Sequence, residues 1–329
     1  WAEMVRYSRS GGEAMAIAVR IARAYTKRDK IAFCGYHGWH DWYLAANLGE
    51  GDLLDGHLLP GLNPLGVPRG LKGTAFPFRY NHFEELEAIV RTHKNEIAAI
   101  VMEPLRGEEP AHGFLERVRE LASKSGAVMI FDEITSAFRL NTGGVHLLYG
   151  VDPDIAVFAK AISNGYPMGA IIGSGKVMKA AQSTFISSTY WTERIGPTAA
   201  LATISKHRQF DVSKHLMATG KKIQEIWKCS ANKADIKIHI SGILPLSSFS
   251  FDYPSGQAMM TLFTQMMLER GFLAAGKFYA SYAHQDIHIT AYQQAVDGIF
   301  CEIKKAIEHN NIEQQLKGEV AHSGFRRLT

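Results

Sequence analysis

Cysteine is scarce in this chain, which has three cysteines, Cys34, Cys229 and Cys301, among 329 residues. They lie far apart and form no C-x-x-C pair, so the sequence favours neither a disulfide framework nor a structural zinc site. We expect all three to be buried thiols. His37 and His40 stand close together, but no third ligand lies near them in the sequence, so we predict no metal site.

Long apolar runs are also missing. No uninterrupted stretch approaches the roughly 20 residues that a membrane-spanning helix needs, and residues 1–7 lack the basic-then-apolar order of a signal peptide. A protein with neither feature is expected in the cytoplasm and not in a membrane. Because Trp1 does not resemble a natural start, we also expect an N-terminal segment of the full protein to precede this chain.

Clustered basic charge is missing as well. The net charge of +4 is spread along the chain, and the most basic stretch, residues 27–30, is interrupted by Asp29. Proteins that bind nucleic acid gather lysine and arginine on one face, so nucleic acid is not an expected partner. A composition of 46% hydrophobic and 21% charged residues is typical of a globular enzyme with a large core.

Helix-like and strand-like segments alternate through the first part of the chain. Apolar residues recur at helical spacing from Ala14 to Tyr25, and an apolar run of strand length, 30–34, follows. The order then repeats as helix 83–94, strand 97–102, helix 116–125 and strands 127–131, 155–159 and 170–173. This alternation predicts an α/β fold with a mostly parallel central sheet and helices on both faces.

The pattern changes beyond Asp211. A long amphipathic helix reaches about Cys229. It is followed by predicted strands 236–240 and 246–251 and predicted helices 257–270 and 291–308. We therefore predict a large domain over residues 1–210, and a connecting helix with a small C-terminal α+β domain over residues 211–329.

Residues able to carry chemistry follow several predicted strands. Tyr36, Glu103, Asp132 and Lys160 each come shortly after a strand has ended. Ligands of open α/β sheets bind outside the carboxyl ends of the strands. An aromatic ring, carboxylates and a lysine are therefore expected to converge at one edge of the sheet.

Lys160 stands between two apolar strands, and we expect its amine to be partly desolvated. Desolvation lowers the pKa of a lysine and supplies the free amine that Schiff-base chemistry needs. Asp132 could keep a pyridinium ring protonated, which lets the ring withdraw electrons from a reacting carbon. Position alone also allows a surface lysine at Lys160 and a solvated turn or helix cap at Asp132.

Ser10, Gly11 and Gly12 directly precede the first amphipathic helix. Backbone N–H groups and the positive end of a helix bind phosphate at such a position. An ordinary N-cap by Ser10 is the simpler interpretation.

With these motifs in order, the chain resembles the class III aminotransferases, and among them the glutamate-1-semialdehyde aminomutase branch. The matching segments are 6–25, 35–38, 102–104, 113–115, 131–134, 138–139 and 160–170. The likeness as a whole extends over nearly all of the chain. The resemblance implies fold type I of the transferases that depend on pyridoxal 5'-phosphate (PLP).

The resemblance also implies roles for single residues. Lys160 would bind PLP as a Schiff base and shuttle the proton, Asp132 would contact the ring nitrogen, and Tyr36 would stack in front of the ring. The other residues that it assigns to the cofactor are His37 of the stacking motif, Ile134 behind the ring, and Ser10, Gly11 and Gly12 at the phosphate.

A homodimer is implied too, in which Thr189 reaches the phosphate of the other subunit. Two departures from the family pattern bear on this region. Gly12 replaces the usual threonine, and segment 188–197 replaces a shorter family segment. The altered segment brings Arg194, which could bind an acidic substrate group, and Glu103 would also lie close to the substrate.

The predicted activity is amino-group transfer between a small amino donor and a carbonyl acceptor, an aldehyde or a ketone, through the Lys160 Schiff base and pyridoxamine phosphate. An aminomutase, which moves the amino group within one molecule, is the alternative because the C-terminal stretch 271–275 looks more like that branch. A catalytically silent binding protein of the same fold is a further alternative. A nicotinamide-dependent oxidoreductase is disfavoured because no G-x-G-x-x-G follows an early strand.

Overall fold

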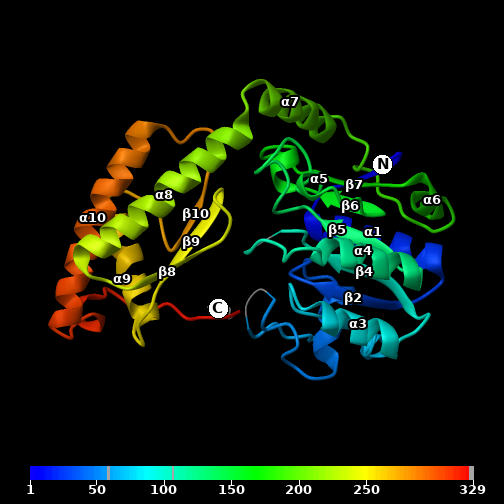
Figure 1. Ribbon diagram of the computed structural model, residues 1–329, viewed down its shortest axis with the longest axis horizontal. Coiled ribbons are helices and arrows are strands. Elements are labelled where there is room, and N and C mark those ends of the chain that lie inside the picture. The colour runs from blue at the N-terminus through cyan, green and yellow to red at the C-terminus, as the bar shows by residue number, and fades with distance from the viewer. Residues whose placement is uncertain (58–59, 106, 326–329) are drawn as a thin grey trace. The chain divides into compact units, whose positions relative to one another are not determined.

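The computed structural model describes residues 1–57, 60–105 and 107–325 (Figure 1). These residues form two compact units, Trp1–Phe210, to which Gly324 and Phe325 also belong, and Asp211–Ser323. Each unit has a hydrophobic core of its own. Within the described ranges, no helix combines the length and the apolar character that crossing a bilayer requires.

The described part of the larger unit is built on a seven-stranded sheet with the order β1-β7-β6-β5-β4-β2-β3. Its strands are β1 (Met4–Ser8), β2 (Lys30–Cys34), β3 (Ala75–Pro77), β4 (Ile97–Met102), β5 (Val128–Asp132), β6 (Ile155–Phe158) and β7 (Gly169–Gly173). Strands β6, β5, β4, β2 and β3, neighbours in this order, pair in parallel. The mostly parallel sheet that the sequence predicts is thereby confirmed.

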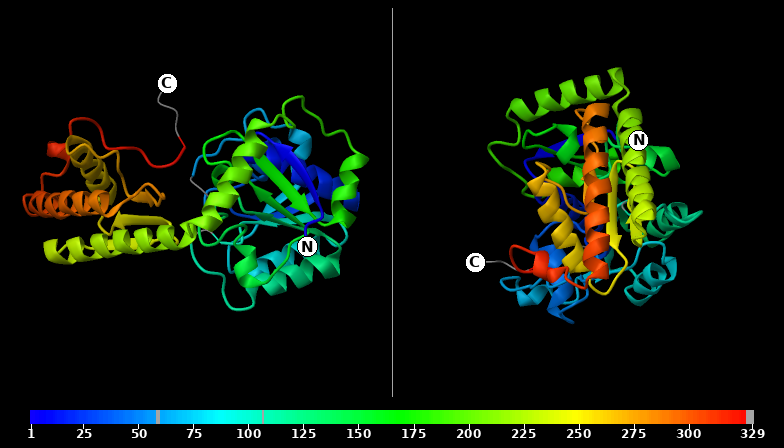
Figure 2. Two further views of the ribbon diagram at one scale, coloured as in Figure 1. Left: turned by 90° about the horizontal axis from the view of Figure 1, so that it is seen from above. Right: turned by 90° about the vertical axis from the view of Figure 1, so that its left-hand side faces the viewer.

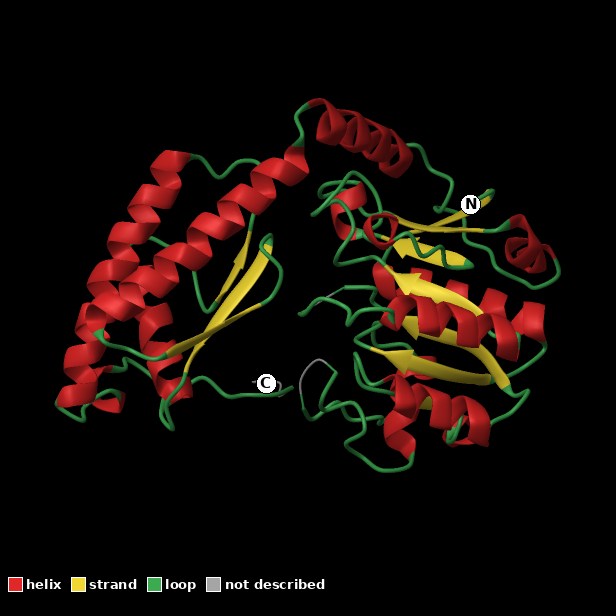
Figure 3. Cartoon of the chain, in the orientation of Figure 1, coloured by secondary structure: helices red, strands yellow, loops and turns green. Residues whose placement is uncertain are grey.

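Helices cover both faces of this sheet (Figure 3). The helices are α1 (Gly11–Thr26), α2 (Asp41–Leu44), α3 (Phe83–Thr92), α4 (Phe114–Ser125), α5 (His146–Tyr149), α6 (Gly175–Met178) and α7 (Ile195–Gln209). Alternate residues of β4 belong to different clusters, Ala99 and Val101 with α1, Ile100 and Met102 with α3 and α4. A strand that is buried on both faces needs this continuous apolar sequence.

The smaller unit combines helices with an antiparallel sheet (Figure 2). Its elements are α8 (Val212–Ala234), β8 (Ile238–Ser241), β9 (Leu246–Phe251), α9 (Gly256–Glu269), β10 (Lys277–Tyr279) and α10 (Asp286–Glu308). Helices α8 and α9 contact the sheet, and α10 packs on both of them. Trp227 is fully buried at the centre, where its Nε1–H donates to the Tyr292 hydroxyl at 2.9 Å.

Two expectations from the sequence need correction. The apolar run that forms β7 was expected to continue the parallel set, yet β7 pairs antiparallel with β6 and with β1. An apolar run does not encode strand direction. Cys34 is buried as expected, but Cys229 and Cys301 are exposed because α8 and α10 present them on their outer sides.

Candidate active site

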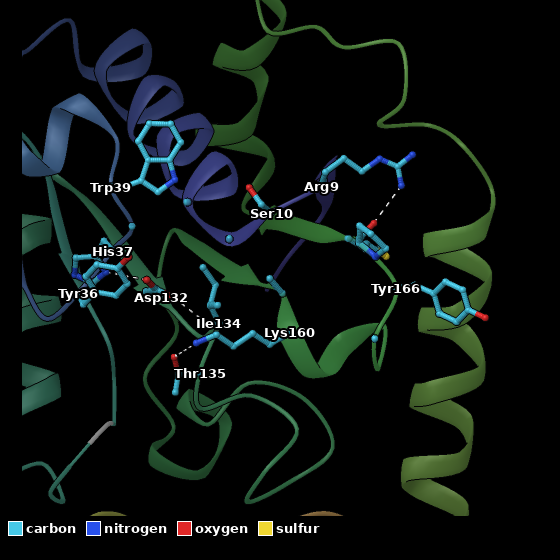
Figure 4. A pocket seen from close by; sticks show the side chains of 17 residues that line it. Arg9, Ser10, Tyr36, His37, Trp39, Asp132, Ile134, Thr135, Lys160 and Tyr166 are labelled. Atoms are coloured by element: carbon cyan, nitrogen blue, oxygen red, sulfur yellow. Dashed lines mark hydrogen bonds and ion pairs between the residues drawn. The ribbon is translucent and has the colours of Figure 1, made fainter. Parts of the chain in front are cut away.

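One cavity of about 430 Å³ in the larger unit collects most of the predicted site residues (Figure 4). Its lining consists of Arg9, Ser10, Gly11, Gly12, Tyr36, His37, Gly38, Trp39, Asp132, Ile134, Thr135, Ala159, Lys160, Gly165, Tyr166, Pro167 and Met168. These segments follow β1, β2, β5 and β6, so the cavity lies at the edge of the sheet where α/β proteins bind ligands. Its volume is typical of small-molecule sites.

Asp132 and His37 form a buried pair in this lining, with 3% and 1% of their surfaces exposed. His37 Nδ1 lies 2.8 Å from Asp132 Oδ2, and His37 Nε2 lies 3.0 Å from the carbonyl oxygen of Cys34. A carbonyl only accepts, so Nε2 carries a proton. The Ile134 N–H donates to Asp132 Oδ1 at 3.0 Å. Partners on both oxygens therefore hold the carboxyl group in one orientation.

The adjacent Glu133 forms a second buried pair, with His146. Its Oε1 accepts from the His146 N–H at 2.9 Å and lies 2.8 Å from His146 Nδ1, while its Oε2 accepts from the Ser136 hydroxyl at 2.7 Å. The Trp1 indole donates to His146 Nε2 at 3.2 Å, so Nδ1 is the nitrogen that carries the proton. These bonds fix the turn that follows β5 and carries Thr135.

Lys160 begins the short 3₁₀ helix η3 (Lys160–Ile162), where its φ of 49° lies in the left-handed region. Such a backbone costs a residue with a side chain roughly 1–3 kcal/mol. Nζ donates a hydrogen bond to Thr135 Oγ1 at 2.8 Å. The side chain is exposed, which corrects the expected partial desolvation. The reason is that β6 ends at Phe158, so Lys160 extends past the sheet into the open cavity.

Glycines at the start of α1 allow close backbone packing beside the cavity. A Cβ on Gly11 would lie 2.9 Å from Ile134 Cδ1, and one on Gly12 would lie 3.2 Å from His40 Cδ2. At Gly38, whose φ is +99°, a Cβ would lie 2.9 Å from the Cα of Gly12. We call Gly11, Gly12 and Gly38 the glycine cradle. The first turn of a helix offers N–H groups and positive potential to an anion at such a place.

Arg9 also lines the cavity, and the sequence analysis missed it. Its Nη1 donates to the Pro167 carbonyl oxygen at 3.1 Å and to Glu193 Oε1 at 2.6 Å, and its Nη2 donates to the Tyr190 carbonyl oxygen. The available signal was its position directly before Ser10 and the glycines. Nothing in the local pattern indicated its distant partners.

Glu193 ties the altered segment 188–197 to Arg9 and to α7. Its two carboxylate oxygens accept from the Ile195 N–H at 2.6 Å and from the Gly196 N–H at 2.9 Å. These N–H groups of Gly196 and Ile195, and after them the Arg9 guanidinium, hold the pKa of Glu193 below its usual value. The carboxylate therefore serves as a cap for the first turn of α7.

Tyr36 is half-buried and makes an edge-on contact with Tyr43, with 5.7 Å between the ring centres. Three other predicted residues lie outside the lining among the described residues. Glu103 is buried and lines a neighbouring cavity of about 560 Å³, while Thr189 and Arg194 are exposed. The predicted contact of Thr189 is with the phosphate of another subunit, and it stays a prediction. The substrate contacts of Glu103 and Arg194 stay predictions as well.

Comparison with known sequences identifies relatives over most of the chain. The family model of class III aminotransferases matches residues 2–277. The 3-aminobutyryl-CoA aminotransferase of Cloacimonas acidaminovorans is 31% identical, over 93% of this chain and 72% of that protein. The glutamate-1-semialdehyde 2,1-aminomutase of Desulforamulus reducens is 33% identical, over 91% of this chain and 73% of that protein.

Solved structures share the fold. The PLP internal aldimine form of the FumI protein from Sphingopyxis has a TM-score of 0.82 at 21% identity, covering 93% of this chain and 72% of that one. An omega-transaminase from Sphaerobacter thermophilus has a TM-score of 0.79 at 24% identity, covering 92% and 75%. With the family match over residues 2–277, these findings establish that the chain belongs to the class III aminotransferase family of PLP-dependent enzymes.

Proposed function

We propose that this enzyme is an aminotransferase that moves an amino group from a small amino donor to an aldehyde or ketone acceptor, with PLP bound in the cavity of Figure 4. One observation carries the proposal. The Lys160 amine, the Asp132–His37 pair and the glycine cradle all line the same cavity. A lysine, a buried carboxylate and an anion site at a helix start are the groups that a phosphorylated pyridine aldehyde requires.

The lining fits PLP group by group. Gly11 and Gly12 let the first turn of α1 pack closely on its neighbours, since a Cβ on either would press on Ile134 or His40, and the N–H groups of such a turn can bind a phosphate. The Asp132 carboxylate, oriented by its two partners, can accept a hydrogen bond from a protonated ring nitrogen. When bound, PLP withdraws electrons from the amine-bearing carbon of the donor.

Lys160 has two tasks in this proposal. Its Nζ would hold the cofactor, and after a donor amine has displaced it, Nζ would take the proton from the amine-bearing carbon and return it to the cofactor. Tyr36 and Ile134 would flank the ring and keep it oriented. Their positions in the cavity lining support this arrangement.

We also propose a homodimer in which Thr189 of one subunit reaches the phosphate of the other. Large aromatic side chains support this, because Trp39, Phe185 and Tyr190 are 71%, 84% and 70% exposed in the single chain. Aromatic side chains are enriched in protein interfaces. Sedimentation of the purified protein should give twice the mass of the chain, and a monomer would contradict the proposal.

Borohydride reduction tests the cofactor site. The protein is mixed with PLP, reduced and digested, and we expect the label on the peptide that contains Lys160. Lys160→Arg should remove that label while leaving the chain folded. In the unreduced sample, an amino donor should bleach the visible band of the bound cofactor. A label on another lysine would overturn the assignment, and a band that no donor bleaches would favour the silent binding protein.

An aminomutase is the second candidate, because the relative from Desulforamulus reducens with that activity in its name is 33% identical to this chain. The two activities differ in their need for a donor. A mutase should convert glutamate-1-semialdehyde without any external amine, whereas the proposed aminotransferase should require one. Conversion in the absence of a donor would replace our proposal with the mutase.

A further inference from the structure

The hydrogen bond from Lys160 to Thr135 joins two segments that are far apart in the sequence. Nζ donates to Thr135 Oγ1 at 2.8 Å, and both residues line the cavity (Figure 4). Thr135 stands in the turn after β5, three residues beyond Asp132. The contact therefore connects the end of β6 to the turn that also holds the Asp132 carboxylate.

The backbone under Lys160 is held in one conformation. Lys160 has a φ of 49°, and the preceding Ala159 is extended, with φ −159° and ψ −152°. The Ile162 N–H donates to the Ala159 carbonyl oxygen at 3.2 Å and closes the turn. A left-handed residue persists only where its surroundings determine it, so the direction in which the Lys160 side chain leaves the backbone is fixed.

The backbone that carries Thr135 is held as well. Ser136, which follows Thr135, donates its hydroxyl to the Glu133 carboxylate at 2.7 Å. The Glu133 carbonyl oxygen accepts from the Ala137 N–H at 2.9 Å. Arg139 Nε donates to the Thr135 carbonyl oxygen at 2.9 Å. The turn is thus bonded before and after Thr135, and this backbone places Oγ1 where it accepts from Lys160 Nζ.

A hydroxyl suits this position for a chemical reason. A lysine that moves protons must exist both as an ammonium and as a free amine, and a carboxylate partner would strongly favour the ammonium. The neutral Thr135 Oγ1 accepts an N–H from either form. When Nζ donates in this way as an amine, its lone pair stays available to take a proton from the substrate.

We propose that Thr135 is a positioning residue that holds the Lys160 amine whenever it is not bonded to the cofactor. This inference rests on the proposed function, because it concerns the step at which Nζ moves a proton. It adds a residue outside the predicted site, and it assigns the turn after β5 two tasks, orienting the Asp132 carboxylate and holding the lysine.

Competitive acetylation of the cofactor-free protein tests the contact directly. Acetic anhydride reacts with the free amine, and peptide mapping compares Lys160 with the other lysines of the same sample. Thr135→Val keeps the branched shape but removes this one acceptor, which binds the charged ammonium more strongly than the amine, so Lys160 should react about 3- to 10-fold faster, the range that one hydrogen bond allows. Thr135→Ser keeps the hydroxyl and should stay within about 2-fold of the wild type.

Thr74→Val is the matched control, because the Thr74 hydroxyl also makes a hydrogen bond, as the donor to the Leu71 carbonyl oxygen at 2.7 Å, and lies outside the cavity lining. It should leave Lys160 reactivity unchanged. An unchanged rate in Thr135→Val would overturn the inference, even if borohydride labels Lys160 and the proposed function stands. A faster rate in a protein that no amino donor turns over would support the holding contact and reject the proposed function.

In the holoenzyme, Thr135→Val should lower kcat for a donor that bleaches the cofactor band by about 10-fold, with little change in KM, since the contact acts after the donor has bound. Deuterium on the amine-bearing carbon of that donor should slow the variant more than the wild type. An isotope effect in Thr135→Val equal to that of the wild type would contradict a positioning role. A kcat in Thr135→Ser as low as that of Thr135→Val would contradict it too.

Discussion

Two consecutive acidic residues at the end of β5, Asp132 and Glu133, lie in different surroundings. Side chains of neighbouring strand residues point to opposite faces, and here Asp132 lines the cavity with His37 while Glu133 lies buried with His146. The motif therefore combines a group for the ligand with a group that stabilises the following turn. Exchanging the two residues would shift each carboxylate by one methylene from its place beside the imidazole.

Asp132→Asn tests the charge of the first carboxylate. The amide keeps the shape and can still accept from the Ile134 N–H, but it has no negative charge to hold a protonated ring. Loss of one such electrostatic partner lowers kcat by about 100- to 1,000-fold in comparable sites. Steady-state rates and PLP titration, measured together, separate turnover from cofactor binding. Turnover within a few fold of the wild type would remove the role proposed for Asp132.

Gly38→Ala tests the cradle, with Gly66→Ala as its matched control. Both glycines have a positive φ, +99° and +93°, but a Cβ at Gly38 meets the Cα of Gly12 whereas one at Gly66 meets nothing within 4 Å. Each variant should lose roughly 1 kcal/mol of stability from the backbone. Only Gly38→Ala should weaken PLP binding, which an absorbance titration measures. Equal affinities in the two variants would argue against the cradle as the phosphate site.

At the scale of elements, the apolar runs were informative where both faces of a strand are buried. The predicted strands 30–34 and 97–102 coincide with β2 and β4. Predicted strand 246–251 coincides with β9, whose residues alternate between buried and more exposed. Strands β1, β3 and β10 are short or partly exposed, so their residues carry little apolar pattern and the sequence did not predict them. The apolar pattern also could not predict the direction of β7, because that direction depends on pairing with strands that lie apart from it in the sequence.

Two helical glycines of the smaller unit should respond in opposite ways to alanine. A Cβ on Gly220 in α8 would lie 1.7 Å from the carbonyl oxygen of Leu244, whereas one on Gly298 in α10 has its nearest neighbour at 4.0 Å. Gly220→Ala should destabilise the fold by about 3 kcal/mol through overpacking, and Gly298→Ala should stabilise it by about 0.5–1 kcal/mol. Urea unfolding checks both. A stable Gly220→Ala variant would contradict the close packing of α8 on the turn before β9.

The link between segment 188–197 and Arg9 should weaken in acid. Because the folded protein lowers the pKa of Glu193 below its ordinary 4.5, the carboxylate contributes stability above that pH, and the contribution is lost as the pH falls through the lowered value. Hydrogen exchange of this segment, corrected for its intrinsic pH dependence, should rise over that interval. Glu193→Gln should abolish the step, and a step that persists in this variant would assign it to another group.

At the scale of the whole molecule, the cavity combines chain segments that sequence order separates widely. Tyr36, Asp132 and Lys160 could be singled out because each follows an apolar strand, and the family resemblance pointed to Gly11 and Gly12. Arg9, Trp39 and Thr135 were missed, because their places in the lining depend on tertiary packing and not on a local pattern. The fold class and the family are confirmed, and the roles of single residues stay predictions.

Cofactor binding should stabilise the two units unequally. Every lining residue of the cavity belongs to the unit Trp1–Phe210, so PLP at 100 times its Kd should add about 2.7 kcal/mol to that unit. Hydrogen exchange with and without PLP should show new protection in strands β5 to β7. Protection confined to α8, α9 and α10 would be incompatible with the proposed site. Gly220→Ala, which weakens the smaller unit alone, should leave the PLP effect in place.

The pairing of β1 with β7 has a consequence for biosynthesis. In the described sheet, β1 is an edge strand whose neighbour is β7, and the last lining residue, Met168, directly precedes that neighbour. A nascent chain therefore leaves β1 without its partner in this sheet, and lacks the complete cavity lining, until β7 has left the ribosome. A translation product truncated before Gly169 would expose the edge of β6 and leave β1 without a partner, which are the conditions under which strands aggregate.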